Sequence, residues 1–230
     1  MRRTWYLPLF ALLLAAAPGF TALASQTGAV QTAPDTLQGY AALIGAFPQP
    51  GSDGAKADVA ILLWLQRTRS PGQVSRADNE VVLHLGIFSE VTGKDLTSGP
   101  FPLTRALSED LQKAVRQITA PLKEKFGRPR PYNAFPQIKP AIPLETSHSY
   151  PSGHATWGMA QATLLAALEP QRKEAILERG RLVGYDRVIG GVHYPSDVEA
   201  GQLLGPAIAQ AWLAHPTQQK RLEAARAEWQ

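Results

Sequence analysis

The sequence predicts an all-α fold, a compact multi-helix bundle, and three observations support this. Apolar residues recur three or four positions apart over most of the chain, no segment of six or more residues alternates as a strand would, and 19 Gly and 19 Pro supply many helix ends. The 230 residues can bury a sizeable core. A hydrophobic fraction of 44% and a charged fraction of 18% exclude a collagen, a coiled coil and a wholly disordered chain.

Three helices are predicted in the first half of the domain, at 58–68, 76–92 and 104–126. Each segment repeats apolar residues at the spacing that places them on one face of a helix. Gly93 and Gly127 directly follow the second and third segments, where glycine commonly ends a helix in a left-handed conformation. The three segments therefore have both a buried face and, in two cases, a stop signal.

Three more helices are predicted in the second half, at 151–168, 171–189 and 195–213. Pro151 and Pro195 stand at the start of the first and last of these segments. Proline is favoured in the first turn of a helix, since its missing N–H would have no intrahelical acceptor there. These segments complete the predicted bundle.

The N-terminal part of the chain is expected to lie outside this bundle. Arg2-Arg3, an apolar run and the small-residue pattern Ala22-Leu23-Ala24 predict a signal peptide over 1–24, and thus a periplasmic or secreted protein. The alternative is an uncleaved membrane anchor, but the run is shorter than the roughly 20 apolar residues of a spanning helix. We expect no stable membrane span in the mature chain, an extended arm over 25–56, and a single helical domain over 57–230.

Cysteine usage and charge narrow the function classes. The chain has no Cys, which excludes disulfide scaffolds, thiolate zinc sites, iron–sulfur clusters and Cys nucleophiles. The formal net charge of +4 is too small for this length to indicate nucleic-acid binding.

Three separated clusters of polar residues carry the chemistry. They are Lys123-x6-Arg130-Pro131, Pro151-Ser152-Gly153-His154 and Arg187-x5-His193-x3-Asp197. Each has an ordinary structural explanation when taken alone: cations complementing a helix dipole, a serine helix cap, and a local His–Asp pair. Taken together, the clusters supply what a tetrahedral oxyanion requires.

The candidate phosphate-binding residues are three cations and a helix N-terminus. Lys123, Arg130 and Arg187 provide donors that match phosphate oxygens. Ser152 and Gly153 fall where the first backbone N–H groups of a helix are unpaired and the helix dipole is positive. We expect all five residues to surround one phosphate.

Two histidines and a carboxylate are the candidate catalytic residues. Asp197 should occupy the third position of its helix, from which a carboxylate reaches back toward His193. Accepting a proton from one imidazole nitrogen leaves the other nitrogen bare, which predicts that His193 is the nucleophile. His154, beside the anion-binding turn, is then the general acid for the leaving alcohol. His148 lies near the site in the sequence and is not counted among its residues.

These motifs resemble those of the type 2 phosphatidic acid phosphatase superfamily, and the stretch from Ser149 to His154 is most similar to bacterial class A non-specific acid phosphatases. The resemblance implies an all-helical fold, hydrolysis of phosphate monoesters through a phosphohistidine, a small phosphorylated substrate, no metal or other cofactor, and a homo-oligomer. One position departs from the family pattern, because Asp186 stands where a serine usually precedes Arg187. That carboxylate either restrains Arg187 or points away from it.

Other functions remain open at this point. The same site occurs in phosphatases of diphosphates and lipid-linked phosphates and in vanadate-dependent haloperoxidases, and an exported phosphate-binding protein would also need a cationic cage. The binding protein is the weaker alternative, since it has no use for two histidines and an orienting aspartate. The sequence does not identify the ester, whose selection we expect to depend on the loops at 97–104 and 133–147.

Overall fold

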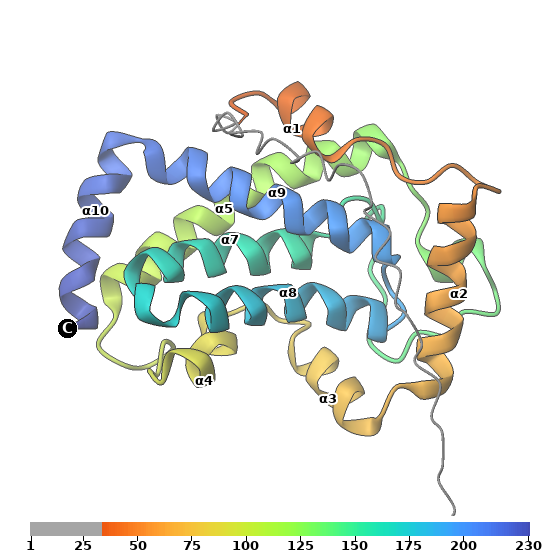
Figure 1. Cartoon of the computed structure of the whole chain (residues 1–230), viewed down its shortest axis with the longest axis horizontal. Helices are drawn as coiled ribbons and strands as arrows, with labels where there is room; N and C mark the ends of the chain where they lie inside the picture. The colour runs from red at the N-terminus through yellow and green to blue at the C-terminus, as the bar shows by residue number, and fades with distance from the viewer. Residues whose placement is uncertain (1–33) are drawn as a thin grey trace, which may run out of the picture. The chain divides into compact units, whose positions relative to one another are not determined.

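The computed structural model describes residues 34–230, and these residues form helices without a β-strand among them (Figure 1). The α-helices are α1 (Leu37–Ile44), α2 (Asp53–Thr68), α3 (Pro71–Asn79), α4 (Ser89–Thr92), α5 (Pro102–Phe126), α6 (Pro131–Ala134), α7 (Gly153–Leu168), α8 (Lys173–Ile189), α9 (Pro195–Ala214) and α10 (Pro216–Arg226). Short 3-10 turns lie at Leu85–Phe88, Pro170–Arg172 and Ala227–Trp229. The predicted all-α fold is confirmed.

The centre of the bundle is α7, which packs against α5, α8 and α9 (Figure 1). Apolar and small residues cover this helix on every side, and nearly all of them are buried. A helix that is apolar all round belongs in the interior, whereas its neighbours need only one apolar face. The N-terminal end of this central helix carries the Pro-Ser-Gly-His motif.

Glycines bring the backbones of the central helices unusually close together. A Cβ atom at Gly158 of α7 would lie only 2.7 Å from the carbonyl oxygen of Gly180 in α8. A Cβ atom at Gly205 of α9 would lie 2.4 Å from the carbonyl oxygen of Thr156 in α7. No larger residue fits at these crossings without a shift of the backbone, so the glycines fix how the three helices pass one another.

The helix predicted over 76–92 is interrupted in the structure. α3 ends at Asn79, and the chain resumes helical geometry only at Leu85. Glu80, directly after α3, is buried in an ion pair with Arg179 of α8, which draws the chain inward at this point. The break also frees backbone carbonyls, one of which, that of Val81, faces the site described below.

The segment 25–56 is not the extended arm that the sequence predicts, as far as it is described. It contains α1 and the first turn of α2, both capped by hydroxyl side chains, with Ser52 accepting from Ala55 N at 3.2 Å in the second case. The hydroxyl of Tyr150 donates to the carbonyl of Ile44 at 2.7 Å, which ties α1 to the loop before α7. The predicted signal peptide over 1–24 lies outside the described residues.

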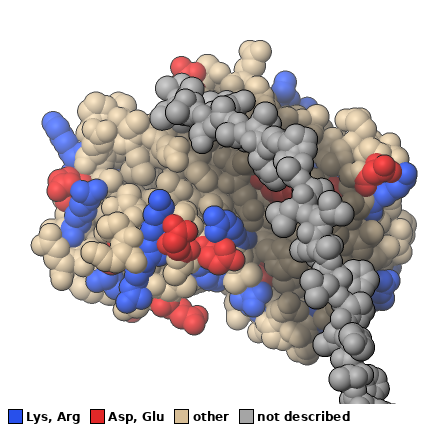
Figure 2. Space-filling model, viewed as in Figure 1, with Lys and Arg blue, Asp and Glu red and all other residues tan. Residues whose placement is uncertain are grey.

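The C-terminal end differs from the prediction by one further helix, α10, which follows His215 and begins at Pro216. Within residues 34–230 no helix has the length and apolar character that crossing a membrane requires. Figure 2 shows basic and acidic side chains interspersed on one face of the molecule. This mixed surface contrasts with the site, where cations gather in the interior.

Candidate active site

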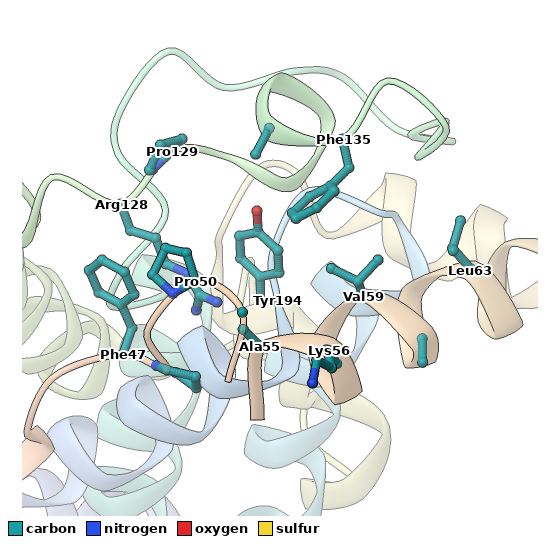
Figure 3. A pocket seen from close by; sticks show the side chains of 14 residues that line it. Phe47, Pro50, Ala55, Lys56, Val59, Leu63, Arg128, Pro129, Phe135 and Tyr194 are labelled. Carbon is teal, nitrogen blue, oxygen red and sulfur yellow. The ribbon is translucent and has the colours of Figure 1, made fainter. Parts of the chain in front are cut away.

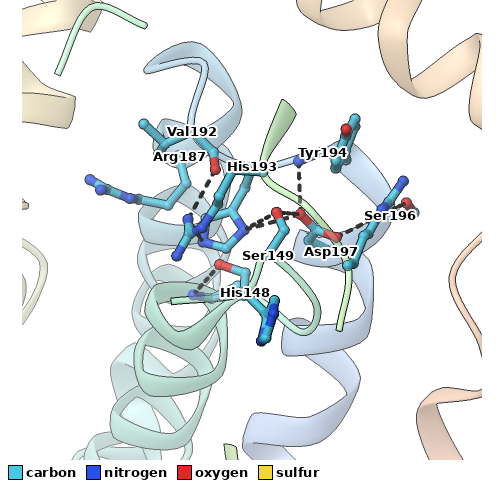
Figure 4. A network of polar contacts seen from close by, with 12 residues as sticks. His148, Ser149, Arg187, Val192, His193, Tyr194, Ser196 and Asp197 are labelled. Carbon is cyan, nitrogen blue, oxygen red and sulfur yellow. Dashed lines mark hydrogen bonds and ion pairs between the residues drawn. The ribbon is translucent and has the colours of Figure 1, made fainter. Parts of the chain in front are cut away.

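The site forms where five segments meet: the C-terminal end of α5, the loop before α7, the first turn of α7, the end of α8 and the start of α9. Figure 4 shows the part built around His193. The three motifs, which span 75 positions in the sequence from Lys123 to Asp197, make direct contacts with one another here.

His193 and Asp197 form the predicted pair. Asp197 is the third residue of α9, and its Oδ2 lies 3.1 Å from His193 Nδ1 and accepts from the backbone N–H of Tyr194 at 3.0 Å. On the other side of the ring, Arg130 Nη1 lies 2.9 Å from His193 Nε2. A guanidinium only donates, so the network assigns the proton to Nδ1 and leaves the lone pair on Nε2.

The surroundings of His193 keep its ring neutral. Complete burial is the largest cause, followed by the positive charges of Arg130 and Lys123, and together they hold the pKa of His193 well below its ordinary value. A neutral imidazole with a bare Nε2 is the form that a nucleophile requires.

Arg130 and Arg187 are the two buried arginines among the predicted phosphate ligands. Arg130 donates to the backbone carbonyls of Ser147 at 2.8 Å and Val192 at 3.0 Å. Arg187 has no exposed surface and bonds the carboxylate of Glu145 at 3.1 Å, as Arg130 does at 2.6 Å. One acidic side chain therefore joins two of the predicted phosphate ligands.

Lys123 lies beside the first turn of α7. Its Cε is 3.9 Å from the place where a side chain on Gly153 would begin, and its Nζ donates to the carbonyl of His148 at 2.5 Å. Burial, and to a lesser extent the charge of Arg130, lowers the pKa of Lys123 to about 8. The imidazole of His148 itself turns outward to Glu124, 3.3 Å away, so it is the backbone of His148 that contributes to the site.

The Pro-Ser-Gly-His turn is used differently from the prediction at one position. The backbone N–H of Ser152 donates to the carbonyl of Asp197 at 2.9 Å, so it is not free for an anion. The Ser152 hydroxyl accepts from Ala155 N at 3.3 Å, which leaves its proton for another acceptor. Gly153 opens α7, where backbone N–H groups have no intrahelical acceptor.

His154, the second residue of α7, lies near the carboxylate that joins Arg130 and Arg187. Its Nε2 lies 3.3 Å from the carbonyl oxygen of Val81, and its Nδ1 lies 3.9 Å from the Glu145 carboxylate. Burial, followed by the charge of Arg187, lowers the pKa of His154 to about 4. The isolated protein thus holds His154 neutral at pH values well above 4, although the predicted general acid must carry a proton.

Comparison with known proteins bears on this arrangement. The family model described as PAP2 superfamily matches residues 106–221, which include all three motifs and the four helices at the centre of the bundle. The chain belongs to the PAP2 superfamily.

Individual PAP2 relatives cover different shares of the chain. A non-specific acid phosphatase of Providencia stuartii is 33% identical over 147 residues, which are 62% of this chain and 59% of that protein. An undecaprenyl-diphosphatase of Sulfolobus acidocaldarius is 40% identical over 81 residues, 35% of this chain and 39% of that protein. The match thus spans less than two thirds of either relative.

A solved PAP2 structure supports the fold. The crystal structure of a transmembrane PAP2-type phosphatidylglycerolphosphate phosphatase from Bacillus subtilis superposes with a TM-score of 0.51, covering 80% of this chain and 92% of that one, at 21% sequence identity. The likeness concerns the helical architecture.

The sequence analysis missed Arg128, which binds the Asp197 carboxylate on the oxygen that faces away from His193. Its Nη1 donates to Asp197 Oδ1 at 2.7 Å, and its Nη2 donates to Asp58 of α2 at 2.8 Å. Its guanidinium also lies 3.8 Å from the ring centroid of Tyr194. The signal that could have revealed it is the repeated Arg-Pro pair, since Arg128-Pro129 stands two residues before Arg130-Pro131.

Ser149 is a second residue that the motifs did not reveal. Its hydroxyl donates to Asp197 Oδ2 at 2.5 Å and lies 3.4 Å from His193 Nδ1 (Figure 4). With Arg128 on the other oxygen, Asp197 has both carboxylate oxygens bonded, which fixes its orientation toward His193.

The departure from the family pattern at Asp186 has a structural explanation. The Asp186 carboxylate accepts two hydrogen bonds from Arg76 of α3, both at 2.7 Å. Of the two alternatives for this residue, the structure favours the one in which it points away from Arg187.

Arg128 and Tyr194 also line a groove of about 640 Å³ outside the site (Figure 3). Its other walls are largely apolar and come from α2 and from the segments around Phe47 and Phe135. The groove lies on the side of Arg128 that faces α2, so it is separate from the cationic space between Arg130 and Arg187.

Proposed function

We propose that this PAP2 protein hydrolyses phosphate monoesters through a phosphohistidine on His193, without a metal ion. The observation that carries the proposal is the neutral imidazole of His193, with its Nε2 bare and its Nδ1 held by Asp197, set against the guanidinium of Arg130. Cationic N–H donors bind oxyanions and do not coordinate metal ions, so the charge of this site suits phosphate itself.

The reaction has two steps in this proposal. The phosphoryl group binds to Lys123, Arg130 and Arg187, and His193 Nε2 forms a bond to phosphorus while the bond to the ester oxygen breaks. His154 gives that oxygen a proton. Water then attacks the phosphohistidine, loses a proton to His154, and releases inorganic phosphate and free His193. Charge neutralisation and positioning supply most of the rate enhancement in such transfers, and the general acid adds roughly 10²–10⁴-fold.

The low pKa of His154 agrees with an acid working range. Its pKa of about 4 in the isolated protein arises from burial and from Arg187. A bound phosphate dianion brings negative charge beside the ring and raises that pKa, since an opposite charge favours the imidazolium. His154 is then protonated in the complex at mildly acid pH, where His193 is still neutral.

The decisive experiment follows phosphate on the enzyme. His193→Ala should abolish hydrolysis of p-nitrophenyl phosphate and leave no acid-labile phosphoenzyme after a rapid quench with labelled substrate. His84→Ala, at an exposed position away from the site, is the matched control and should retain both. A phosphoenzyme that survives in His193→Ala would assign the nucleophile to another residue, and loss of wild-type activity in chelator would contradict metal independence.

The substrate class is part of the proposal. The relatives named above act, by their names, on phosphate esters generally and on undecaprenyl diphosphate. We favour small monoesters because the acid phosphatase is matched over 147 residues of this chain and the diphosphatase over 81. A panel of a sugar phosphate, a nucleotide, a short-chain lipid phosphate and a diphosphate separates these classes, and a vanadate-loaded sample assayed with bromide and peroxide tests the haloperoxidase alternative.

Location outside the cytoplasm also belongs to this proposal, on the grounds of the N-terminal sequence pattern. Fractionation of expressing cells should find activity in a chain whose N-terminus is Ser25.

A further inference from the structure

Glu145 lies in the loop before α7, and its carboxylate joins the two buried guanidinium groups of the site. Oε2 accepts from Arg130 Nη2 at 2.6 Å, Oε1 accepts from Arg187 Nη2 at 3.1 Å, and His154 Nδ1 is 3.9 Å from Oε1. These three partners are the groups that the proposed reaction assigns to the phosphoryl oxygens and the leaving group. None of the sequence motifs includes Glu145.

The donors of Arg130 are fully used while Glu145 is in place. A guanidinium has five N–H groups. The Nε of Arg130 donates to the Ser147 carbonyl, Nη1 contacts the Val192 carbonyl and His193 Nε2, and Nη2 donates to Glu145 and to the Ser147 hydroxyl. A phosphoryl group can gain a bond from Arg130 only if an existing acceptor leaves. The two backbone carbonyls are fixed by the fold, and attack by His193 Nε2 frees a donor only on Nη1. Glu145 is the charged acceptor that can leave, and its departure frees a donor on Nη2.

The backbone of Glu145 is anchored although its side chain is free to turn. The hydroxyl of Tyr132 donates to the Glu145 carbonyl at 2.6 Å and accepts from the Glu145 N–H at 3.1 Å. The side chain itself is 28% exposed, and the residues on either side, Leu144 and Thr146, are exposed. A rotation about the side-chain bonds of Glu145 therefore moves the carboxylate toward solvent without a rearrangement of the loop.

Glu145 keeps its charge to a lower pH than an ordinary glutamate does. Burial on its own would raise the pKa of Glu145, but the adjoining guanidinium groups of Arg130 and Arg187 outweigh that effect and lower the pKa below the ordinary value for a glutamate. The carboxylate that bonds Arg130 and Arg187 is thus an anion at the mildly acid pH at which the proposed phosphatase works.

We propose that Glu145 is an intramolecular competitor of the substrate, a built-in anion that each incoming phosphoryl group must displace from Arg130 and Arg187. This inference rests on the proposed function for the identity of the substrate. A carboxylate offers two oxygens and one charge, as a phosphodiester does, whereas a monoester offers three non-bridging oxygens and up to two charges. The competition therefore weakens binding of every phosphate by the cost of displacing Glu145 from the two guanidinium groups.

The test compares Glu145→Gln with the wild-type protein, using inorganic phosphate as the probe in calorimetry. The amide retains the shape and an acceptor but not the charge, so the dissociation constant of phosphate should fall at least tenfold, about 1.4 kcal/mol. Tyr132→Phe, which releases the backbone anchor, should give a smaller gain in phosphate affinity.

Glu124→Gln is the matched control. It removes the same charge from a residue near the same site that contacts His148 and no guanidinium, and it should leave phosphate affinity within twofold of wild type. Unchanged or weaker phosphate binding in a folded Glu145→Gln protein would overturn the inference and indicate that Glu145 positions the arginines. If the wild-type protein hydrolyses no ester but Glu145→Gln still binds phosphate more tightly, the proposed function fails and the competition stands.

Discussion

At the scale of single residues, the site depends on one carboxylate held by four groups from three parts of the chain. Asp197 is bonded to Arg128, Ser149, the Tyr194 N–H and His193. Each bond removes a direction in which the carboxylate could turn, so the imidazole of His193 is left with one orientation. A buried ion that has lost its water needs such a complete set of partners.

The sequence predicted the residues of this site that belong to contiguous motifs and missed those that act across the fold. His193 and Asp197 are four positions apart, at the start of a helix, so local geometry alone brings them together. Asp58 is 138 positions from Ser196, and its carboxylate accepts hydrogen bonds from the Ser196 N–H and hydroxyl. No local sequence pattern connects the two residues. Such contacts follow from the packing of α2 on α9, which periodicity does not determine.

Lys123 leads to a prediction about pH. Its pKa of about 8 means that it loses its charge as pH rises above 8, whereas an ordinary lysine keeps its charge to about pH 10. Phosphate monoesters have a second pKa of about 6, so their charge changes little above pH 7 and a large change in KM there belongs to the enzyme. We expect KM for p-nitrophenyl phosphate to rise several-fold between pH 7 and pH 9. Lys123→Arg, which stays charged, should flatten that rise, and an unchanged rise in this variant would mean that another group titrates.

At the scale of elements, the helices of the site are positioned by glycine contacts and not by the polar groups alone. Gly201 and Gly205 lie along the face of α9 that meets α7, and Gly184 brings α8 against the start of α7. Gly184 and Gly201 meet the first turn of α7 and Gly205 meets the turn after it, so the distance from His154 to His193 depends on these contacts. The sequence did not reveal this role, because a glycine within a predicted helix indicates only low helix propensity and does not show which helix packs against it.

Gly205→Ala tests this dependence. The added Cβ would meet the Thr156 carbonyl oxygen at 2.4 Å, and a backbone atom cannot give way as a side chain can. We expect a loss of about 1–3 kcal/mol in the free energy of unfolding, measured in urea, together with reduced kcat. Gly72→Ala in α3 is the matched helical control, since its Cβ has only Ser70 Oγ at 3.9 Å, and it should be neutral or stabilising. Equal effects of both substitutions would show that helix propensity, and not the crossing, decides stability.

At the scale of the whole molecule, the helical class, most of the helices and some of their ends were predictable, while the break inside 76–92 was not. The stop after 104–126 is Gly127 in a left-handed conformation, as expected. The break inside 76–92 has no glycine or proline; it follows from the burial of Glu80 against Arg179, 99 positions away. A helix end that depends on a distant partner leaves no local signal, and the same break brings the Val81 carbonyl to His154.

Residues of the C-terminal segment cap the N-terminus of α5, the helix that carries Lys123. The Glu228 carboxylate accepts from the backbone N–H groups of Leu103 at 2.7 Å and Thr104 at 2.9 Å, in the first turn of α5. Trp229 donates from Nε1 to the Thr104 hydroxyl at 2.9 Å and packs against Phe101. The last residues thus satisfy the N-terminus of a helix more than 120 positions earlier in the chain.

Glu228→Ala should lower stability without changing the chemistry. Removing a carboxylate that caps a helix costs about 0.5–2 kcal/mol, which for a domain of this size lowers Tm by about 2–4 °C per kcal/mol. Lys123 lies about 30 Å along α5 from the capped turn, so kcat and KM at 25 °C should stay within twofold of wild type. Glu223→Ala, which removes an exposed i,i+3 pair with Arg226 in α10, is the control and should leave Tm unchanged within about 1 °C. A fall in kcat for Glu228→Ala well below its Tm would indicate instead that strain at the start of α5 is transmitted along the helix to Lys123.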